Sequence, residues 1–135
     1  MGNITDSHQT QLSAACLLLS VAHADEILEN EELQTIEDIL IDFFTITAND
    51  CEKLVQEAMD MMKNSTGLFE FGQHLNTTFD KDDKRDFITC IFEVAYADGN
   101  LHYLENHTVK KIANILNINR QDILISKTDM EKFLD

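Results

Sequence analysis

The apolar residues of this chain recur with the spacing of helices. A nearly continuous apolar run covers 11 residues, from Ala14 to Ala24. Farther along, one stripe follows the i, i+3, i+4, i+7 spacing of a single helix face: Ile36, Ile39, Leu40 and Phe43. The pattern predicts an apolar helix and an amphipathic helix, joined by a short acidic connector.

Capping residues predict where helices begin. Asp6 or Ser7 caps the first helix, which we expect to run to about Ala24. Thr47, with Asp50 three residues later, opens the helix that follows the amphipathic one. The remaining signals predict helices over 47–63, 67–75 and 80–97, the last capped by Asp80, and two short C-terminal pieces beginning near Asn119 and Thr128.

A repeat becomes visible when the chain is aligned with itself at an offset of 73 residues, so that residues 16–43 lie over 89–116. Identical residues then meet at Val21 and Val94, Ala22 and Ala95, Ala24 and Ala97, Asp25 and Asp98, Leu28 and Leu101, Glu32 and Glu105, Thr35 and Thr108, and Ile39 and Ile112. Unrelated segments of this length share about two identities on typical residue frequencies. We therefore prefer an internal repeat to a coincidental likeness of two amphipathic segments.

The repeat and the composition predict the fold class. The second copy has its own helical stripe: Val109, Ile112, Ala113 and Leu116. The chain has no proline and four glycines, which suits helices joined by short turns. We expect an all-α fold, with residues 1–135 forming a single domain. Two helical-hairpin repeats, about 10–46 and 83–119, pack together in it around a pseudo-two-fold axis.

The charge excludes several partners. The net charge is -15, and residues 1–68 hold 13 acids with only Lys53 and Lys63 as bases. Such a surface repels phosphate backbones and anionic lipids, so we expect no nucleic-acid binding. Cations and basic protein surfaces are the expected partners.

Cysteine usage and the length of the apolar run predict the compartment. Cys16, Cys51 and Cys90 form no CxxC pair, and their odd number excludes complete pairing within the chain. With no recognisable signal peptide, this predicts a reducing cytoplasm. The apolar run is too short to span a bilayer, so we expect no direct membrane insertion. Cysteines in apolar helices are usually inert, and we expect no catalytic role for them.

The acidic connectors carry the candidate chemistry. From Asp98 to Glu105 the sequence resembles the second half of an EF-hand loop, but the earlier ligand positions hold apolar or aromatic residues. A true EF-hand is therefore rejected. The equivalent carboxylates of the first copy are Asp25 and Glu32. If the halves pair symmetrically, the four carboxylates converge and repel one another unless a cation or protons neutralise them.

Two interpretations of these carboxylates stay open. In the first, Asp25, Glu32, Asp98 and Glu105 are metal ligands, and their oxygen-only chemistry favours calcium, magnesium or manganese over zinc. In the second, they are structural, because glutamates favour helix N-termini and aspartates cap helices or hydrogen-bond within turns. No organic cofactor is expected, since the chain has no glycine-rich phosphate loop.

Methionine and phenylalanine residues in the middle of the chain also allow two interpretations. The residues concerned are Met59, Met61, Met62, Phe69, Phe71 and Phe79. We predict that they fill the core, and the alternative is a soft docking groove.

At the connectors the chain resembles the TerB-like tellurite-resistance family. The motifs that carry the resemblance are Val21 to Asp25 with Glu32, and Val94 to Gly99 with Leu101 and Glu105. The resemblance spans about residues 10–120 and implies a compact, pseudo-symmetric bundle of about seven helices, in bacteria. It also implies that the four carboxylates are divalent-cation ligands. Glu26 stands where the second copy has Gly99, a departure from a fully symmetric site.

The resemblance further implies a role without enzymatic activity, as an adaptor in tellurite or chemical stress and in membrane-linked complexes. We expect a non-catalytic cytoplasmic domain that binds a divalent cation weakly at the connectors and docks a protein partner. The alternative is a metal-free interaction module whose acidic N-terminal half binds a basic partner. A carboxylate-dependent hydrolase is the third interpretation, and no substrate cleft is indicated for it.

Overall fold

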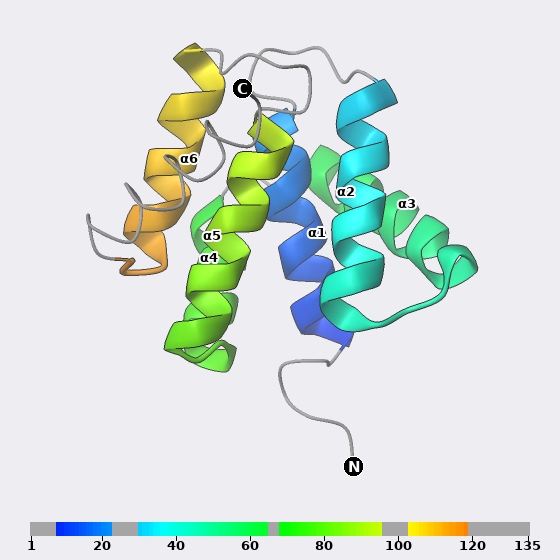
Figure 1. Cartoon of the computed structure of the whole chain (residues 1–135), viewed down its shortest axis with the longest axis horizontal. Helices are drawn as coiled ribbons and strands as arrows, with labels where there is room; N and C mark the ends of the chain where they lie inside the picture. Colours follow the sequence, from blue (N-terminus) through cyan, green and yellow to red (C-terminus); the bar gives the residue numbers. More distant parts are fainter. Residues whose placement is uncertain (1–7, 23–29, 65–67, 96–102, 119–135) are drawn as a thin grey trace.

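The computed structural model describes residues 8–22, 30–64, 68–95 and 103–118, and the regular structure of these residues is helical throughout. Its six helices are α1 (His8–Ala22), α2 (Asn30–Phe44), α3 (Ala48–Asn64), α4 (Leu68–Thr78), α5 (Lys81–Ala95) and α6 (Tyr103–Ile115) (Figure 1). The predicted all-α fold is confirmed. The two expected C-terminal pieces lie outside the described residues.

Two predicted caps open their helices. The Thr47 side-chain oxygen accepts a hydrogen bond of 3.1 Å from the backbone nitrogen of Asp50, at the start of α3. At the start of α5, the Asp83 backbone nitrogen donates to Asp80 Oδ1 at 2.8 Å, and the Asp80 nitrogen donates back to Asp83 Oδ2 at 3.2 Å. Each bond satisfies a donor that the helix itself leaves unpaired.

Helix α4 extends past its predicted end at residue 75 and ends at Thr78. Leu75 and Phe79, one helical turn apart, are both buried. The Phe79 nitrogen donates to the Leu75 carbonyl at 2.7 Å, which continues the helical hydrogen bonding. Burial of Phe79 therefore extends this helix beyond the end that its sequence suggests.

The helix boundaries follow the 73-residue sequence repeat. His8 and Lys81, Ala22 and Ala95, and Asn30 and Tyr103 are each 73 positions apart. Both predicted stripes face the core: Ile36, Ile39, Leu40, Val109, Ile112, Ala113 and Leu116 are buried, and Phe43 packs partly buried against them. The hairpins α1–α2 and α5–α6 are thus the two copies.

Helix α1 lies at the centre of the bundle. It contacts every other described helix, and Figure 1 shows it between α5 and α2. Helices α3 and α4, which the chain inserts between the two hairpins, make extensive contact with α1. Because α4 also packs on α6, this insertion joins the two repeats. Among the residues just described, no helix has the length and apolar content needed to cross a membrane.

Both hairpins end in a residue with a positive φ angle. Thr45, after α2, has φ 53°, and Asn117, after α6, has φ 58°. The Ile46 nitrogen donates to the Ile41 carbonyl at 3.3 Å, and the Ile118 nitrogen donates to the Ala113 carbonyl at 3.0 Å. These bonds close the helix ends in the same way, although Thr45 is β-branched and ill-suited to this conformation.

Candidate functional site

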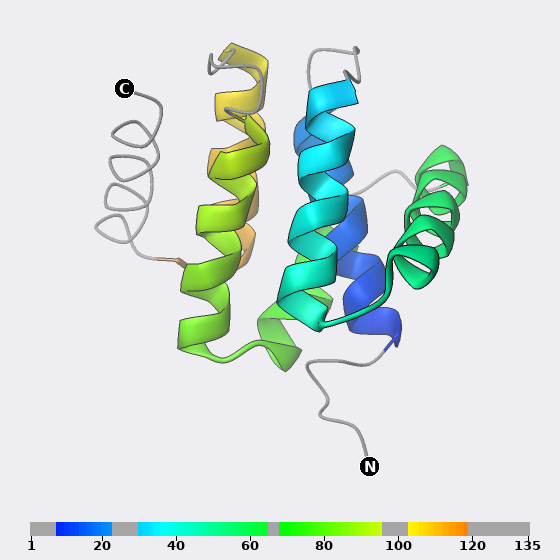
Figure 2. The same cartoon turned by 45° about the vertical axis from the view of Figure 1, so that its right-hand side comes forward.

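The helix ends that flank the two acidic connectors lie at the same end of the bundle. Helices α1 and α5 end there and α2 and α6 begin there, at the top of the two views in Figures 1 and 2. The predicted ligands Asp25 and Asp98 lie outside the described residues.

Glu32 is the predicted ligand whose side chain the structure describes. It is the third residue of α2 and is 2% exposed. A carboxylate at this position is favoured by the positive end of the helix dipole, typically by about 0.3–1 kcal/mol. Glu105 occupies the equivalent third position of α6, and its side chain lies outside the described part.

The described residues alone do not form a metal site. Among them, no three histidine, cysteine or carboxylate side chains are grouped so that they could hold an ion. A cation site at this end therefore requires side chains outside the described part in addition to Glu32. The four-carboxylate ligand set stays a prediction.

The three cysteines are free, and their surroundings keep them protonated. Burial raises the pKa of the Cys16 and Cys90 thiols to about 12 and that of Cys51 to about 11. The Cys16 thiol donates to the Ala58 carbonyl at 3.8 Å, an interaction typical of a buried thiol. Because the thiolate is the reactive form, these side chains are poor nucleophiles at neutral pH.

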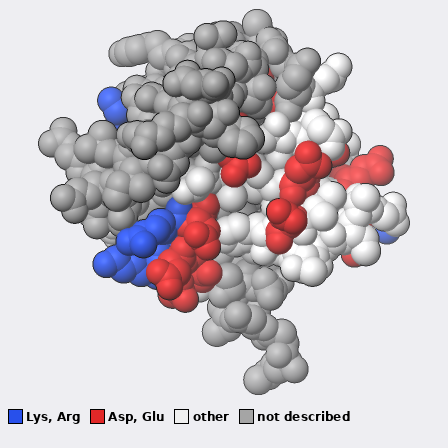
Figure 3. Space-filling model, viewed as in Figure 1, with Lys and Arg blue, Asp and Glu red and all other residues white. Residues whose placement is uncertain are grey.

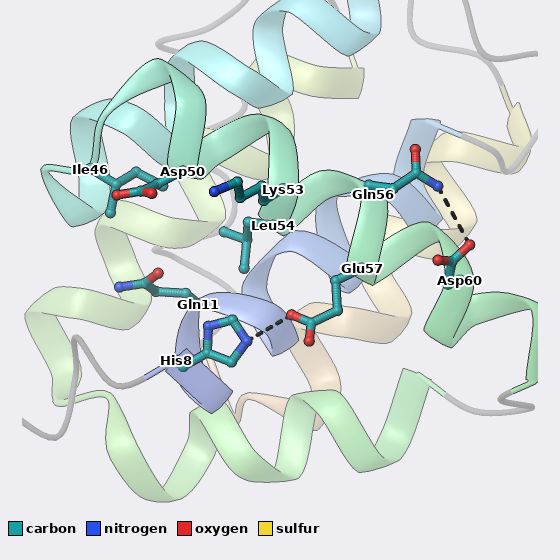
Figure 4. A pocket seen from close by; sticks show the side chains of 9 residues that line it. All are labelled: His8, Gln11, Ile46, Asp50, Lys53, Leu54, Gln56, Glu57 and Asp60. Carbon is teal, nitrogen blue, oxygen red and sulfur yellow. Dashed lines mark hydrogen bonds and ion pairs between the residues drawn. The ribbon is translucent and has the colours of Figure 1, made fainter.

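An open groove of about 760 Å³ lies between α1 and α3. Figure 4 shows Glu57 reaching from α3 toward His8 on α1, where His8 Nε2 lies 2.7 Å from Glu57 Oε2. These side chains are 66% and 50% exposed, so the pair contributes little to stability. Asp50 and Lys53 line the same groove.

A second groove, of about 600 Å³, adjoins the first and lies among α1, α3 and α4. Leu12, Met61 and Phe71 supply its apolar side chains. Its carboxylates are Glu57, Asp60 and Glu70, and Glu57 and Asp60 also line the first groove. The two grooves therefore share an acidic edge on α3.

The prediction that the central methionines and phenylalanines fill the core needs a correction. Phe79 is buried, and Met59, Met62 and Phe71 pack partly buried against the core. Met61 and Phe69, by contrast, are 39% and 62% exposed. Apolar spacing does not predict which side chains of α3 and α4 face outward, because that depends on how these helices sit on α1.

A third groove, of about 390 Å³, lies between α2 and α5 and is acidic. Asp38, Asp42 and Glu93 line it together with Cys90. Burial and the nearby Asp42 charge raise the pKa of the Glu93 carboxyl. Figure 3 shows acidic side chains over both helices on this face, with the larger basic patch on the side where α5 and α6 lie. The sequence does not predict that Asp42 and Glu93 lie close together, since these two carboxylates belong to different repeats.

Comparison with protein families gave one result. The family model described as tellurite resistance protein TerB matches residues 11–127, which include α1 from Gln11 onward and all of α2 to α6. Comparisons with curated proteins and with solved structures found no significant match.

Proposed function

This chain belongs to the TerB tellurite-resistance family, and on that premise we propose that it is a non-catalytic domain that binds a divalent cation weakly. The site is the end of the bundle where α1 and α5 end and α2 and α6 begin. Its ligands are Asp25, Glu32, Asp98 and Glu105. Oxygen ligands suit calcium, magnesium or manganese, and a bound cation would neutralise the carboxylates.

One observation carries this proposal, namely that all four helix ends flanking the two connectors lie at one end of the bundle (Figures 1 and 2). The end of α1 and the start of α2 are thereby brought to the same region as the end of α5 and the start of α6, which lie far away in the sequence. Glu32 lies at that end, buried in the first turn of α2. The first turns of α2 and α6 present Glu32 and Glu105 at equivalent positions.

The test follows thermal unfolding of EDTA-stripped protein while calcium, magnesium or manganese is added. A ligand that binds only the folded state stabilises it by about 2.7 kcal/mol at a hundred times its Kd. We expect a saturable rise in Tm with one of these ions. The double variant Asp98→Asn/Glu105→Gln should keep its helical circular dichroism and lose that rise.

A matched control removes the same charges elsewhere. Asp82 and Glu52 are exposed, on α5 and α3, so Asp82→Asn/Glu52→Gln should keep the cation response. A cation response that survives in the Asp98/Glu105 variant would show that the assigned ligands are wrong. No response of the wild-type protein at millimolar ion would overturn cation binding itself.

The second candidate is a metal-free module that binds a basic partner through an acidic surface. The acidic edge shared by the two grooves, with Glu57 and Asp60, favours it. A chelator distinguishes the candidates: it lowers the Tm of a protein that carries a functional cation and leaves the Tm of the metal-free module unchanged. We count an enzyme third, because burial keeps the three thiols protonated and makes them poor nucleophiles.

We place either activity in a tellurite or chemical stress response, with a protein partner that belongs to a membrane-linked complex. The family description supports the tellurite response. The three free cysteines agree with the reducing cytoplasm that the sequence predicts. Loss of tellurite tolerance on deletion, restored by the wild-type chain and not by the Asp98/Glu105 variant, would tie the site to that response.

A further inference from the structure

The groove among α1, α3 and α4 combines apolar side chains with an acidic edge. Leu12, Met61 and Phe71 line it, and Met61 is 39% exposed although it is large and apolar. A methionine side chain is flexible and can adapt to different apolar surfaces. Exposed apolar surface bordered by polar groups is typical of protein-interaction sites.

The charged lining of this groove is negative. Glu57, Asp60 and Glu70 line it, and within the described part of the chain no lysine or arginine does. Two side chains approach these carboxylates from outside: Lys63 Nζ lies 3.9 Å from Asp60 Oδ1, and the His8 imidazole Nε2 lies 2.7 Å from Glu57 Oε2. All four of these side chains are at least half exposed, and exposed pairs of this kind contribute little.

The apolar side chains and the acidic edge together indicate which kind of ligand the groove can bind. Nucleic acid and anionic lipid surfaces are repelled by the three carboxylates. A purely apolar peptide would strip water from those carboxylates without giving them a partner. An amphipathic helix satisfies both requirements when it places aliphatic side chains against Leu12, Met61 and Phe71 and lysine or arginine at the edges.

We propose that this groove docks a basic amphipathic helix of a partner protein. The proposal rests on the protein-interaction role suggested above and is independent of cation binding. Leu12 lies near the start of α1, whereas the cation is assigned to the end of that helix, beyond Ala22. At 1.5 Å per residue, the two positions are about 15 Å apart along α1.

The experiment uses fluorescent synthetic peptides and the full chain in buffer that contains EDTA. The test peptide carries leucine at i, i+3, i+4 and i+7 and lysine on its other faces. One control peptide has the same composition in scrambled order, and a second has glutamate in place of lysine. Anisotropy titrations at low salt should show the test peptide binding about tenfold more tightly than the scrambled one, and the acidic peptide not binding.

Charge-reversed variants locate the binding surface. Asp60→Lys/Glu70→Lys changes two exposed residues of the groove, and Asp82→Lys/Asp86→Lys changes two exposed residues of α5 by the same total charge. We expect the groove variant to lose about tenfold or more in affinity and the α5 variant to lose less than about threefold. Met61→Gln should weaken binding, and Phe69→Gln, at an exposed position of α4 that does not line the groove, should not.

The outcomes separate the proposals. Equal losses in the two charge-reversed variants, or equal binding of the ordered and scrambled peptides, would show non-specific attraction to an acidic surface and overturn the groove assignment. Failure of the wild-type protein to bind the test peptide would overturn it as well. The cation titration, carried out without peptide, stands or falls on its own result.

Discussion

Helices α1 and α5 are the same element in the two copies of the repeat, and they occupy different environments. Eleven of the 15 residues of α1 are buried, against six of the 15 residues of α5. Leu17 of α1 is fully buried, whereas its equivalent, Cys90, is partly exposed beside a groove. Ser20 and its equivalent Glu93 differ in charge, and Glu93 faces the acidic groove between α2 and α5.

The difference comes from what the chain inserts between the copies. Helices α3 and α4 pack on α1 and cover faces of it. Within the described structure, neither of them makes comparably extensive contact with α5. A repeated sequence thus yields two helical hairpins without making them equivalent in packing. The central copy needs apolar residues on nearly every side, and the outer copy keeps polar residues on one face.

The largest expected effect compares equivalent residues of the two helices. Leu17→Ala should lower the free energy of unfolding by about 3 kcal/mol, because it leaves a cavity at the centre of the bundle. Cys90→Ala should cost less than about 1 kcal/mol, since it removes a smaller and partly exposed group. Urea denaturation measures both values. Equal costs would contradict the central position of α1.

The second prediction concerns the joint between the inserted helices and the second repeat. A Cβ atom at Gly72 of α4 would lie 2.3 Å from Ile115 Cγ2 of α6. In Gly72→Ala, overpacking should cost about 1–3 kcal/mol, and helix propensity should return roughly 1 kcal/mol, so we expect a net destabilisation of up to about 2 kcal/mol. Gln73→Ala, at the exposed neighbouring position, is the control and should be neutral or stabilising in thermal unfolding.

The third prediction uses the charge difference between Ser20 and Glu93. Because the pKa of Glu93 is raised in the folded state, folding favours its protonated form. Its contribution to stability is complete below the ordinary glutamate pKa and is lost as pH rises through the folded pKa. Glu93→Gln should therefore raise Tm at neutral pH and leave it unchanged at acid pH.

The control for Glu93 follows from its neighbour. The Asp42 charge adds to burial in raising the Glu93 pKa, and Asp38 lines the same groove. Asp42→Asn should reduce the stabilisation that Glu93→Gln gives at neutral pH. A pH-independent gain from Glu93→Gln would point to packing rather than charge as its cause.

The smallest effect is expected where the two hairpins end. Thr45 and Asn117 both have positive φ angles, and asparagine tolerates this conformation better than a β-branched residue. Thr45→Asn should therefore stabilise the protein by up to about 1 kcal/mol, measured as a higher urea midpoint. Asn117→Thr, the reverse exchange in the second hairpin, should destabilise it. If neither exchange changes the midpoint, the backbone strain assigned to Thr45 is absent.

The sequence predicts the candidate site only in part. Asp25, Glu32, Asp98 and Glu105 are identifiable because the repeat aligns them in pairs, and the two helix-capping predictions at Thr47 and Asp80 are confirmed by hydrogen bonds. The burial of Glu32 is not predictable in this way. It depends on how the start of α2 packs, and charge alone suggests a solvated acidic face.

Local chemistry along the chain explains the elements and their order. Apolar spacing and capping residues predict helices because each acts over one or two helical turns. The 73-residue repeat is visible when the chain is aligned with itself. Which copy becomes central, which side chains of α3 and α4 face outward, and which grooves form depend on contacts between distant segments. The periodicity of a helix identifies its apolar face and does not identify the neighbour that covers it. For that reason the tertiary structure alone shows the acidic groove lined by Met61 and the proximity of Asp42 to Glu93.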